Sequence, residues 1–403
     1  MYIKRDISQE LTTSPAWIQI LTGPRQCGKS TLFASLYLDK PHQEINFDDL
    51  HLRQLANQDP ALFISQFDPP LLLDEVQYVP NLFPELKKKI DQIKRAAVFE
   101  EKIKKKIATL FCLTGSNQIL MDENIKESLA GRASYYYLNT LTVHEILQAL
   151  PEIKIKDILF QGGWPELYST PSLITINYLN DYIRSFVEKD IVMQAGIQKL
   201  TEFHTVIRLL SARTGNLIDY ADVAKDSGVR SITIKEWVSF LERADLIYLL
   251  KPYFTNLNKR LIKTPKFYFL DTGLAARLQG WPDANTLFMS PQIGALFETL
   301  VLAEIVKFIR NYNKDWQLFF WRTKEGEEID FLLQTNQNLY AFEAKCALQN
   351  KFDHAAYPTT FNKLFSPKHP LVIVTLGGKQ LQLSKDCLAL PITELHDFLK
   401  KLS

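Results

Sequence analysis

What is scarce in this sequence narrows the classes of protein to which it can belong. No segment reaches the roughly 18 consecutive apolar residues of a membrane-spanning helix, so no membrane partner is expected. The N-terminal segment MYIKRDISQE lacks the apolar core and cleavage site of a signal peptide, and a cytoplasmic location is expected. Cysteine is rare and widely spaced, which excludes a disulfide framework and a cysteine metal site: only Cys27, Cys112, Cys346 and Cys387 occur.

The sequence also lacks an excess of either charge. Its 47 Lys and Arg residues nearly balance 45 Asp and Glu residues, so any nucleic-acid surface would have to be local. Hydrophobic residues make up 46% of the chain and charged residues 23%, which is typical of globular rather than disordered proteins. Because one domain usually holds roughly 100–200 residues, the 403 residues predict several domains.

The first motif is a glycine-rich loop between a strand and a helix. An apolar run at 17–22 leads into the loop, and a helical pattern follows at 32–36; the loop consists of Gly23, Pro24, Arg25, Gln26, Cys27, Gly28, Lys29, Ser30 and Thr31. This is the G-x-x-x-x-G-K-[ST] pattern in the context that a phosphate-binding P-loop requires. Lys29 is expected to reach the β- and γ-phosphates of a nucleotide, and the Ser30 hydroxyl to ligate Mg²⁺.

Two acidic residues follow a second buried strand. The run PPLLL at 69–73 ends in Asp74 and Glu75. Asp74 is expected to hold Mg²⁺ through water, and Glu75 to orient and polarise the attacking water. Acids at a strand end also occur as plain helix caps, an alternative that the nearby P-loop disfavours. The pair therefore predicts hydrolysis of the nucleotide.

Two further residues are candidates for catalysis, each with an alternative. Asn117 follows a third strand at 110–114 and is predicted to sense the γ-phosphate or the attacking water, whereas a turn cap is equally compatible with the sequence. Arg132 precedes a strand at 133–138 and is predicted to stabilise transition-state charge, or else to be a surface arginine.

These segments together resemble the AAA+-type ATPases of archaea and bacteria that carry a C-terminal DUF4143 region. The resemblance spans nearly the whole chain and rests on the P-loop and on the segments LLLDEVQY (71–78), LTGSNQ (113–118), LAGR (129–132), QGGWPE (161–166) and DTG (271–273). It implies ATP binding and ATP hydrolysis with Mg²⁺. It names no substrate.

The middle of the chain has the pattern of three helices followed by two strands. Helices are expected at 203–210, 219–225 and 231–241, and strands at 246–250 and 266–270 flank a wing. Such spacing is typical of DNA-binding winged helices, but winged helices also dock proteins or serve as structural parts of ATPases. The third helix has few cations beside its acids, which makes sequence-specific DNA reading the less favoured alternative; the candidate contacts are Arg230, Ser231, Thr233, Lys235, Lys259, Arg260 and Lys263.

The C-terminal third carries acids on a helix and on two strands. Glu298 lies on a predicted helix, Asp330 on the returning strand of a hairpin, and Glu343 and Lys345 on one face of the next strand. The set resembles the PD-(D/E)XK nuclease fold, although Ile329 stands where that pattern has proline. Asp330 and Glu343 would share Mg²⁺ or Mn²⁺, Glu298 would complete the shell, and Lys345 would position or deprotonate water. The alternative is a fold of nuclease ancestry that now binds a partner and whose acids and lysine pair as ions.

Together the motifs predict an α/β protein of four parts. These are a P-loop AAA+-type ATPase core (1–140), a helical linker or lid (141–195), a winged-helix-like domain (196–270) and a nuclease-like domain (271–403). The favoured function is an ATP-dependent protein that acts on nucleic acid (DNA), with ATP binding gating metal-dependent cleavage. The alternative is an ATP-driven switch whose C-terminal half recognises a protein partner. A ring or dimer is required if Arg132 acts on a neighbouring subunit, and a monomer suffices if it acts within its own.

Overall fold

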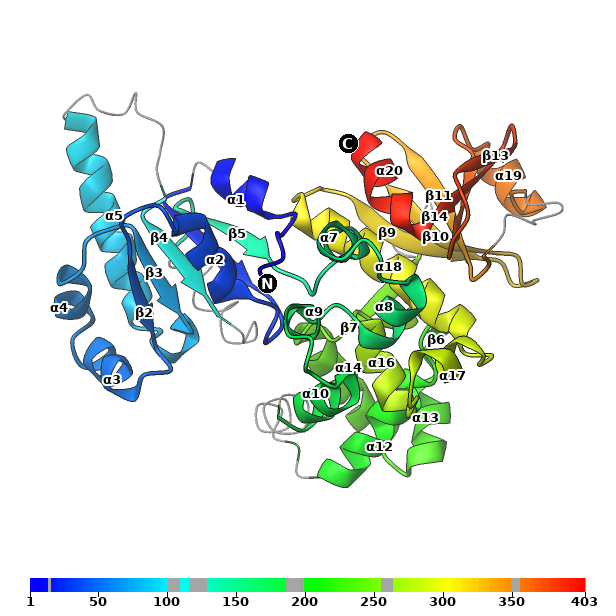
Figure 1. Ribbon diagram of the computed structural model, residues 1–403, viewed down its shortest axis with the longest axis horizontal. Helices are drawn as coiled ribbons and strands as arrows, with labels where there is room; N and C mark the ends of the chain where they lie inside the picture. The colour runs from blue at the N-terminus through cyan, green and yellow to red at the C-terminus, as the bar shows by residue number, and fades with distance from the viewer. Residues whose placement is uncertain are drawn as a thin grey trace. The chain divides into compact units, whose positions relative to one another are not determined.

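The computed structural model describes residues 1–13, 16–99, 109–115, 129–185, 197, 199–254, 264–348 and 356–402. The chain forms two compact units, shown in Figure 1. The N-terminal unit comprises Lys4–Asn139 with Arg310–Asn313, and the C-terminal unit comprises Met1–Ile3, Thr140–Ile309 and Lys314–Ser403. Within the described residues, no helix is both long enough and apolar enough to cross a bilayer.

The N-terminal unit is built on a five-stranded sheet in the order β2-β3-β4-β1-β5, in which each strand is parallel to its neighbours. Its strands are β1 (Ile18–Thr22), β2 (Gln43–Asn46), β3 (Leu71–Asp74), β4 (Phe111–Thr114) and β5 (Ala133–Tyr137). Its helices are α1 (Ser8–Thr13), α2 (Lys29–Tyr37), α3 (Leu50–Gln58), α4 (Pro60–Ser65), η1 (Val76–Tyr78) and α5 (Leu82–Phe99). The inner strands are nearly continuous apolar runs because both faces of a parallel sheet are covered.

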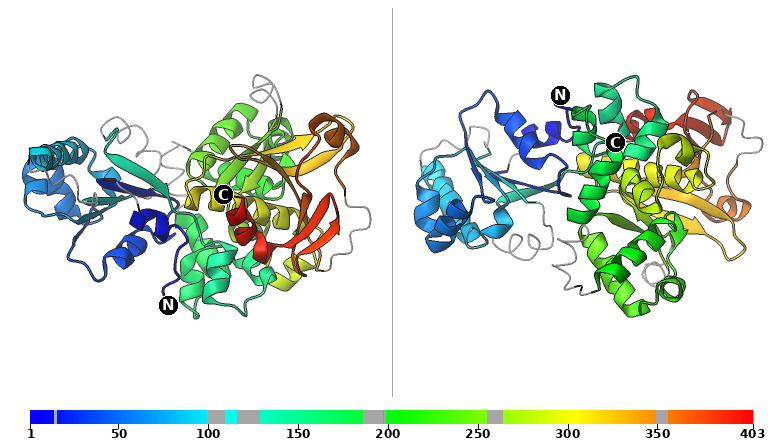
Figure 2. Two further views of the ribbon diagram at one scale, coloured as in Figure 1. Left: turned by 90° about the horizontal axis from the view of Figure 1, so that it is seen from above. Right: turned by 60° about the horizontal axis from the view of Figure 1, so that its bottom comes forward.

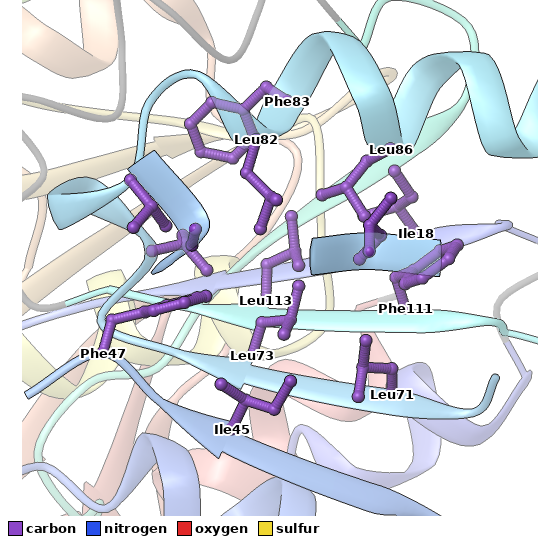
Figure 3. Close-up of a cluster of buried hydrophobic side chains, with 14 of the residues drawn as sticks. Ile18, Ile45, Phe47, Leu71, Leu73, Leu82, Phe83, Leu86, Phe111 and Leu113 are labelled. Carbon is purple, nitrogen blue, oxygen red and sulfur yellow. The ribbon is translucent and has the colours of Figure 1, made fainter. Parts of the chain in front are cut away.

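Helices cover both faces of this sheet. On one face, strand residues such as Leu73 and Phe111 pack with Leu82 and Leu86 of α5, as Figure 3 shows. On the other face, Leu72 packs in a second cluster with side chains of α1 and α2. Each fully buried Leu or Phe side chain contributes about 1.5–3 kcal/mol by leaving water. Successive strand residues alternate between the two cores. The carboxyl ends of β1, β3 and β4 lie at one edge because β4 pairs in parallel with both β1 and β3.

The C-terminal unit contains a nine-stranded mixed sheet in the order β13-β14-β12-β11-β10-β9-β7-β8-β6. Figure 2 shows its yellow to red strands from two further sides. The strands are β6 (Asn216–Leu217), β7 (Ile247–Pro252), β8 (Lys266–Phe269), β9 (Gln317–Arg322), β10 (Glu328–Gln334), β11 (Leu339–Lys345), β12 (Leu371–Thr375), β13 (Leu381–Ser384) and β14 (Cys387–Pro391).

The helices of this unit lie before, between and after these strands. They are α7 (Val143–Ala149), α8 (Ile155–Gln161), α9 (Pro165–Ser169), α10 (Thr175–Tyr182), α12 (Leu200–Ser211), α13 (Tyr220–Ser227), α14 (Ser231–Arg243), α16 (Thr272–Gln279), α17 (Ala284–Phe288), α18 (Ile293–Asn311), α19 (Thr359–Phe365), η4 (Ile392–Glu394) and α20 (Leu395–Lys401). The helical pattern that the sequence predicts after residue 141 is confirmed as far as α10, as are the three helices and two strands predicted over 203–270.

A pairing between β7 and β9 makes this sheet continuous. Lys251 and Pro252 of β7 are in parallel register with Phe319 and Phe320 of β9. The hairpin β7–β8 and the strands β9–β14 therefore share one sheet. The predicted parts 141–195, 196–270 and 271–403 lie together in the C-terminal unit, except for Arg310–Asn313.

The QGGWPE and DTG segments contact each other at the junction of α8 and α16. Asp271 caps α16 by accepting a hydrogen bond from the Leu274 N–H, and it also accepts one of 2.8 Å from the Gly163 N–H. A Cβ atom on Gly273 would lie 2.3 Å from the backbone oxygen of Gln161. The glycines thus permit the backbones to approach closely, and these two signature segments have a packing role.

Candidate functional site

The glycine-rich loop leaves β1 and enters α2 as the sequence predicts. Gly28 lies in the left-handed region with φ of +91° immediately before α2, so that the first helical amides face the loop. The Lys29 ammonium is buried and donates hydrogen bonds to the backbone oxygens of Gly23 and Pro24, at 3.2 and 2.8 Å. Lys29 therefore already lies along the inside of the loop, where a phosphate group would be bound.

Residues outside the motif hold the loop in place. A Cβ atom on Gly23 would lie 2.0 Å from the backbone oxygen of Leu138, and Gly23 has φ of +147°, so only glycine fits. The buried Arg5 guanidinium donates a 2.8 Å hydrogen bond to the Cys27 backbone oxygen. Cys27 itself is buried, with its Sγ 3.4 Å from the Leu138 oxygen. These contacts preorganise the loop.

Asp74 ends β3 and meets the P-loop serine. The Ser30 hydroxyl donates a 2.7 Å hydrogen bond to Asp74 Oδ2, and the Thr114 hydroxyl at the end of β4 donates to Asp74 Oδ1. A serine hydroxyl and a carboxylate are hard oxygen donors of the kind that Mg²⁺ prefers. The residues present therefore fit the predicted ion. Sequence analysis did not single out Thr114, although its position at the end of a neighbouring parallel strand is a usable signal.

Glu75 is held in an uncommon backbone conformation. Its φ and ψ are +56° and +41°, the left-handed region that non-glycine residues seldom adopt, and it directly precedes η1. The Gln77 side-chain amide donates a hydrogen bond to Glu75 Oε2. Gln77 is buried, and its Oε1 finds no partner among the described residues. Such strain often marks a functional position, and Gln77 is a residue that sequence analysis missed.

The structure places Arg132 in an ion pair with Asp91 of α5. Arg132 Nε and Nη2 bind the two carboxylate oxygens of Asp91, and Nη1 donates to the backbone oxygen of Ala130. The hydrogen bond from Arg132 lowers the pKa of Asp91 despite the opposing effect of desolvation. Asn117 lies outside the described residues, so its predicted role stays a prediction.

The second candidate site lies in the C-terminal unit. Glu298 of α18, Glu328 and Asp330 of β10 and Glu343 of β11 form what we call the carboxylate cluster. Lys266 of β8 is paired with Glu298 at 3.0 Å and with Glu328, and its Nζ lies 4.0 Å from Asp330 Oδ1. Tyr268, two residues along the same strand, donates a 2.5 Å hydrogen bond to Glu298 Oε1.

The remaining carboxylates of the cluster have partners of their own. Asp330 Oδ2 accepts a 2.9 Å hydrogen bond from the Ala344 N–H, and Glu343 Oε2 accepts one of 2.8 Å from the Lys345 ammonium. The structure thus brings the predicted residues Glu298, Asp330, Glu343 and Lys345 into one region. It adds Lys266, Tyr268 and Glu328, which sequence analysis missed; Lys266 and Tyr268 lie on one face of a predicted strand.

Burial and mutual repulsion shift the ionisation of the cluster. Burial first, and then the charge of Asp330, raise the pKa of Glu298, and the same two causes raise the pKa of Glu343 to about 7. Burial alone would lower the pKa of Lys266, but the charges of Glu298, Asp330 and Glu328 outweigh it and raise that pKa. Glu298 and Glu343 therefore ionise less readily than free carboxyl groups, whereas Lys266 keeps its charge.

The predicted divalent metal does not fit this arrangement. Within the described part of the chain, Glu298, Asp330 and Glu343 do not bring one oxygen each within 4.8 Å of one another. The Lys266 ammonium stands among the acids instead, with a side chain only 5% exposed.

The three-helix segment presents a mixed surface. On α14, Ile232, Lys235 and Glu236 are exposed, and the Lys235 ammonium lies 5.3 Å from the ring centre of Tyr220. Arg230 is also exposed, while Ser231 and Thr233 are half-buried. The predicted wing residues Lys259, Arg260 and Lys263 lie outside the described residues. DNA contact by this segment stays a prediction.

Three family models match separate parts of the chain. Residues 16–147 match an AAA domain, residues 152–285 a domain of unknown function (DUF8612), and residues 293–395 a second domain of unknown function (DUF4143). The chain therefore carries an AAA-type P-loop ATPase domain in a mixed α/β structure, and the expected C-terminal DUF4143 region is confirmed.

Similar proteins extend over most of the chain. The uncharacterized protein Rv2008c of Mycobacterium tuberculosis is 29% identical over 333 residues, which cover 81% of this chain and 70% of the relative. An uncharacterized protein of Haemophilus influenzae is 24% identical over 345 residues, covering 78% and 79%. The solved structure of the Walker-type ATPase PABY2304 of Pyrococcus abyssi aligns with 68% of this chain and 94% of its own, at 12% identity and a TM-score of 0.38. The names of the two relatives state no activity.

Proposed function

We propose that the protein binds ATP with Mg²⁺ and hydrolyses it at the N-terminal unit. The observation that carries this proposal is the 2.7 Å hydrogen bond from Ser30 to Asp74, which joins the P-loop hydroxyl to the strand-end carboxylate. These are the two protein groups between which a P-loop site holds the nucleotide's metal ion, and Lys29 directly precedes Ser30 in α2.

Each residue of the site has a task in this proposal. The amides at the start of α2 and the Lys29 ammonium bind the phosphates, and Lys29 exchanges the backbone oxygens of Gly23 and Pro24 for phosphate oxygens. Ser30 and Asp74 hold Mg²⁺, which neutralises charge on the phosphates when bound. Glu75 orients the attacking water and takes up its proton, because a carboxylate held by Gln77 keeps a fixed direction.

Two variants test the proposal. Lys29→Ala should lose binding of a fluorescent ATP analogue, and Glu75→Gln should keep binding while phosphate release falls about 10²–10⁴-fold, the range that a general base contributes. Lys40→Ala, an exposed lysine shortly after α2, is the matched control and should match the wild type. Unaltered binding by Lys29→Ala would refute the P-loop assignment, and unaltered turnover by Glu75→Gln would refute the role of Glu75.

The C-terminal half has two candidate functions. In the first, the protein acts on DNA, the three-helix segment contacts it, and Glu298, Asp330, Glu343 and Lys345 cleave it with a metal under the control of ATP. In the second, the protein is an ATP-driven switch whose C-terminal half recognises another protein. The pairing of Lys266 with Glu298 and Glu328 favours the second, because these acids already have a cation.

Cleavage assays separate the two candidates. Linear, supercoiled and branched DNA would be incubated with Mg²⁺ or Mn²⁺, with and without ATP, alongside the Asp330→Ala/Lys345→Ala double variant. We expect no cleavage that depends on these residues. Cleavage that the double variant loses would establish the nuclease instead. A steep loss of DNA affinity with salt would keep DNA as a partner even without cleavage, since counterion release accompanies phosphate binding.

A further inference from the structure

Lys266 is a buried lysine surrounded by carboxylates. Its side chain is 5% exposed, and its Nζ contacts Glu298 of α18 and Glu328 of β10 while lying 4.0 Å from Asp330. The Phe320 ring centre lies 5.7 Å from the same nitrogen. A lysine ammonium is a compact point charge with three donors, so this nitrogen stands among oxygen atoms much as a cation would.

The partners of the cluster leave no carboxylate unsatisfied. Lys266 forms ion pairs with Glu298 and Glu328, and Glu328 also pairs with Arg322. The Ala344 N–H binds the second oxygen of Asp330, and Lys345 binds Glu343. A divalent ion could enter only by displacing the Lys266 ammonium. The displaced ammonium would then stay buried without a partner or force its strand to open, and either outcome is costly.

We propose that Lys266 takes the place of a divalent cation in the carboxylate cluster, so that the cluster is closed to metal and instead ties β8, α18 and β10 together. The proposal concerns only the C-terminal unit and does not depend on ATP hydrolysis. The proposal predicts that a variant without this lysine gains a metal site. The acids that remain are hard oxygen donors of the kind that bind Mn²⁺ or Mg²⁺.

The test is a calorimetric titration of the full chain with Mn²⁺. Every protein carries Asp74→Ala, so that the nucleotide site lacks the carboxylate that would hold its metal ion. With Lys266 intact, millimolar Mn²⁺ should give neither binding heat nor a rise in melting temperature. Lys266→Met, which keeps the apolar stem and removes the charge, should gain an Mn²⁺ site and melt at higher temperature in Mn²⁺ than without it. Adding Asp330→Asn should abolish both effects.

Control variants show whether a gain of Mn²⁺ binding is specific to the loss of Lys266. Lys307→Met removes another buried lysine, one that pairs with Glu304 on α18 outside the cluster, and should gain no Mn²⁺ site. If Lys266→Met does not fold, Lys266→Met/Glu328→Gln leaves one fewer unpaired acid and carries the same expectation. Mn²⁺ binding by the protein with Lys266 intact, lost in Asp330→Asn, would overturn the proposal. Folded Lys266 variants that bind no Mn²⁺ would overturn it as well.

Discussion

The guanidinium of Arg132 and the carboxylate of Asp91 form a two-point ion pair, with Nε–Oδ1 and Nη2–Oδ2 distances of 2.8 Å each. Asp91 lies in α5, and Arg132 directly precedes β5. A planar guanidinium matched to both carboxylate oxygens has a fixed direction, unlike a free surface arginine. Any role of Arg132 at a phosphate therefore requires this pair to open.

The ion pair predicts a specific pattern of coupling. Asp91→Ala and Arg132→Ala should each lower the melting temperature slightly, and the double variant should lower it by less than the sum, because both single changes remove the same interaction. Phosphate release should fall in Arg132→Ala and not in Asp91→Ala if Arg132 acts on the transition state. Equal rates in all three variants would show that Arg132 is structural only.

The hydrogen bond between Gln77 and Glu75 predicts an effect on turnover rather than on binding. Gln77→Ala should lower kcat for ATP about 2–10-fold, the equivalent of one hydrogen bond of about 0.5–1.5 kcal/mol, with KM unchanged. The exposed Gln54 of α3 offers a matched control, since Gln54→Ala touches nothing at the site. A rise in KM with constant kcat would mean that Gln77 supports the nucleotide pocket and does not position Glu75.

Glu343 makes stability depend on pH. Its pKa is raised from 4.5 to about 7 in the folded protein by burial and by Asp330, so folding disfavours the charged form. The contribution of Glu343 to the free energy of unfolding should therefore fall as pH rises from about 4.5 to about 7 and stay constant above that. Glu343→Gln should be close to wild type near pH 5 and about 1–3 kcal/mol more stable near pH 8 in urea unfolding. A variant less stable than wild type at the higher pH would show that the Lys345 pair dominates.

Gly273 predicts a steric effect on folding. Gly273→Ala would place a Cβ atom 2.3 Å from the Gln161 backbone oxygen, so α8 and α16 must move apart, at about 1–3 kcal/mol. Gly294 lies in α18 with no atom within 4 Å of an added Cβ, and Gly294→Ala should be neutral or stabilising because alanine favours a helix. Thermal unfolding of the two variants decides the matter. Equal melting temperatures would contradict the packing role of the DTG segment.

The parts of the fold that could be predicted from the sequence are those whose residues form a recognisable pattern within a short segment. The P-loop, the strand before Asp74 and the three helices over 203–270 have periodic apolar residues and cap signals within a few positions, and the structure has them at nearly the predicted bounds. Asp74 and Ser30 are also recognisable from local sequence, because Asp74 ends the apolar run of β3 and Ser30 ends the glycine-rich motif at the start of α2. For the nucleotide site, the spacing of residues within short motifs was therefore enough to predict the residues that meet.

The carboxylate cluster could not be completed in this way. Lys266 is distant in sequence from Glu298 and Glu328, and only the tertiary structure brings its ammonium among them. The alternation along β8 shows that Lys266 and Tyr268 share a face, but not which acids that face meets. A charged residue in an otherwise apolar strand was the one available signal, since a buried lysine requires a partner. The residues next to Lys266 in the sequence do not show which acids pair with it.

The parallel register of β7 with β9 bears on how this chain can be divided. A fragment ending at Leu270 would leave Lys251 and Pro252 of β7 without their neighbour, and a fragment beginning at Asp271 would expose one side of β9. Unpaired strand edges with apolar side chains such as Phe319 and Phe320 are templates for association with other chains. Fragments cut at this boundary should therefore aggregate, whereas a cut near Asn139 severs none of the strand pairings between the described residues.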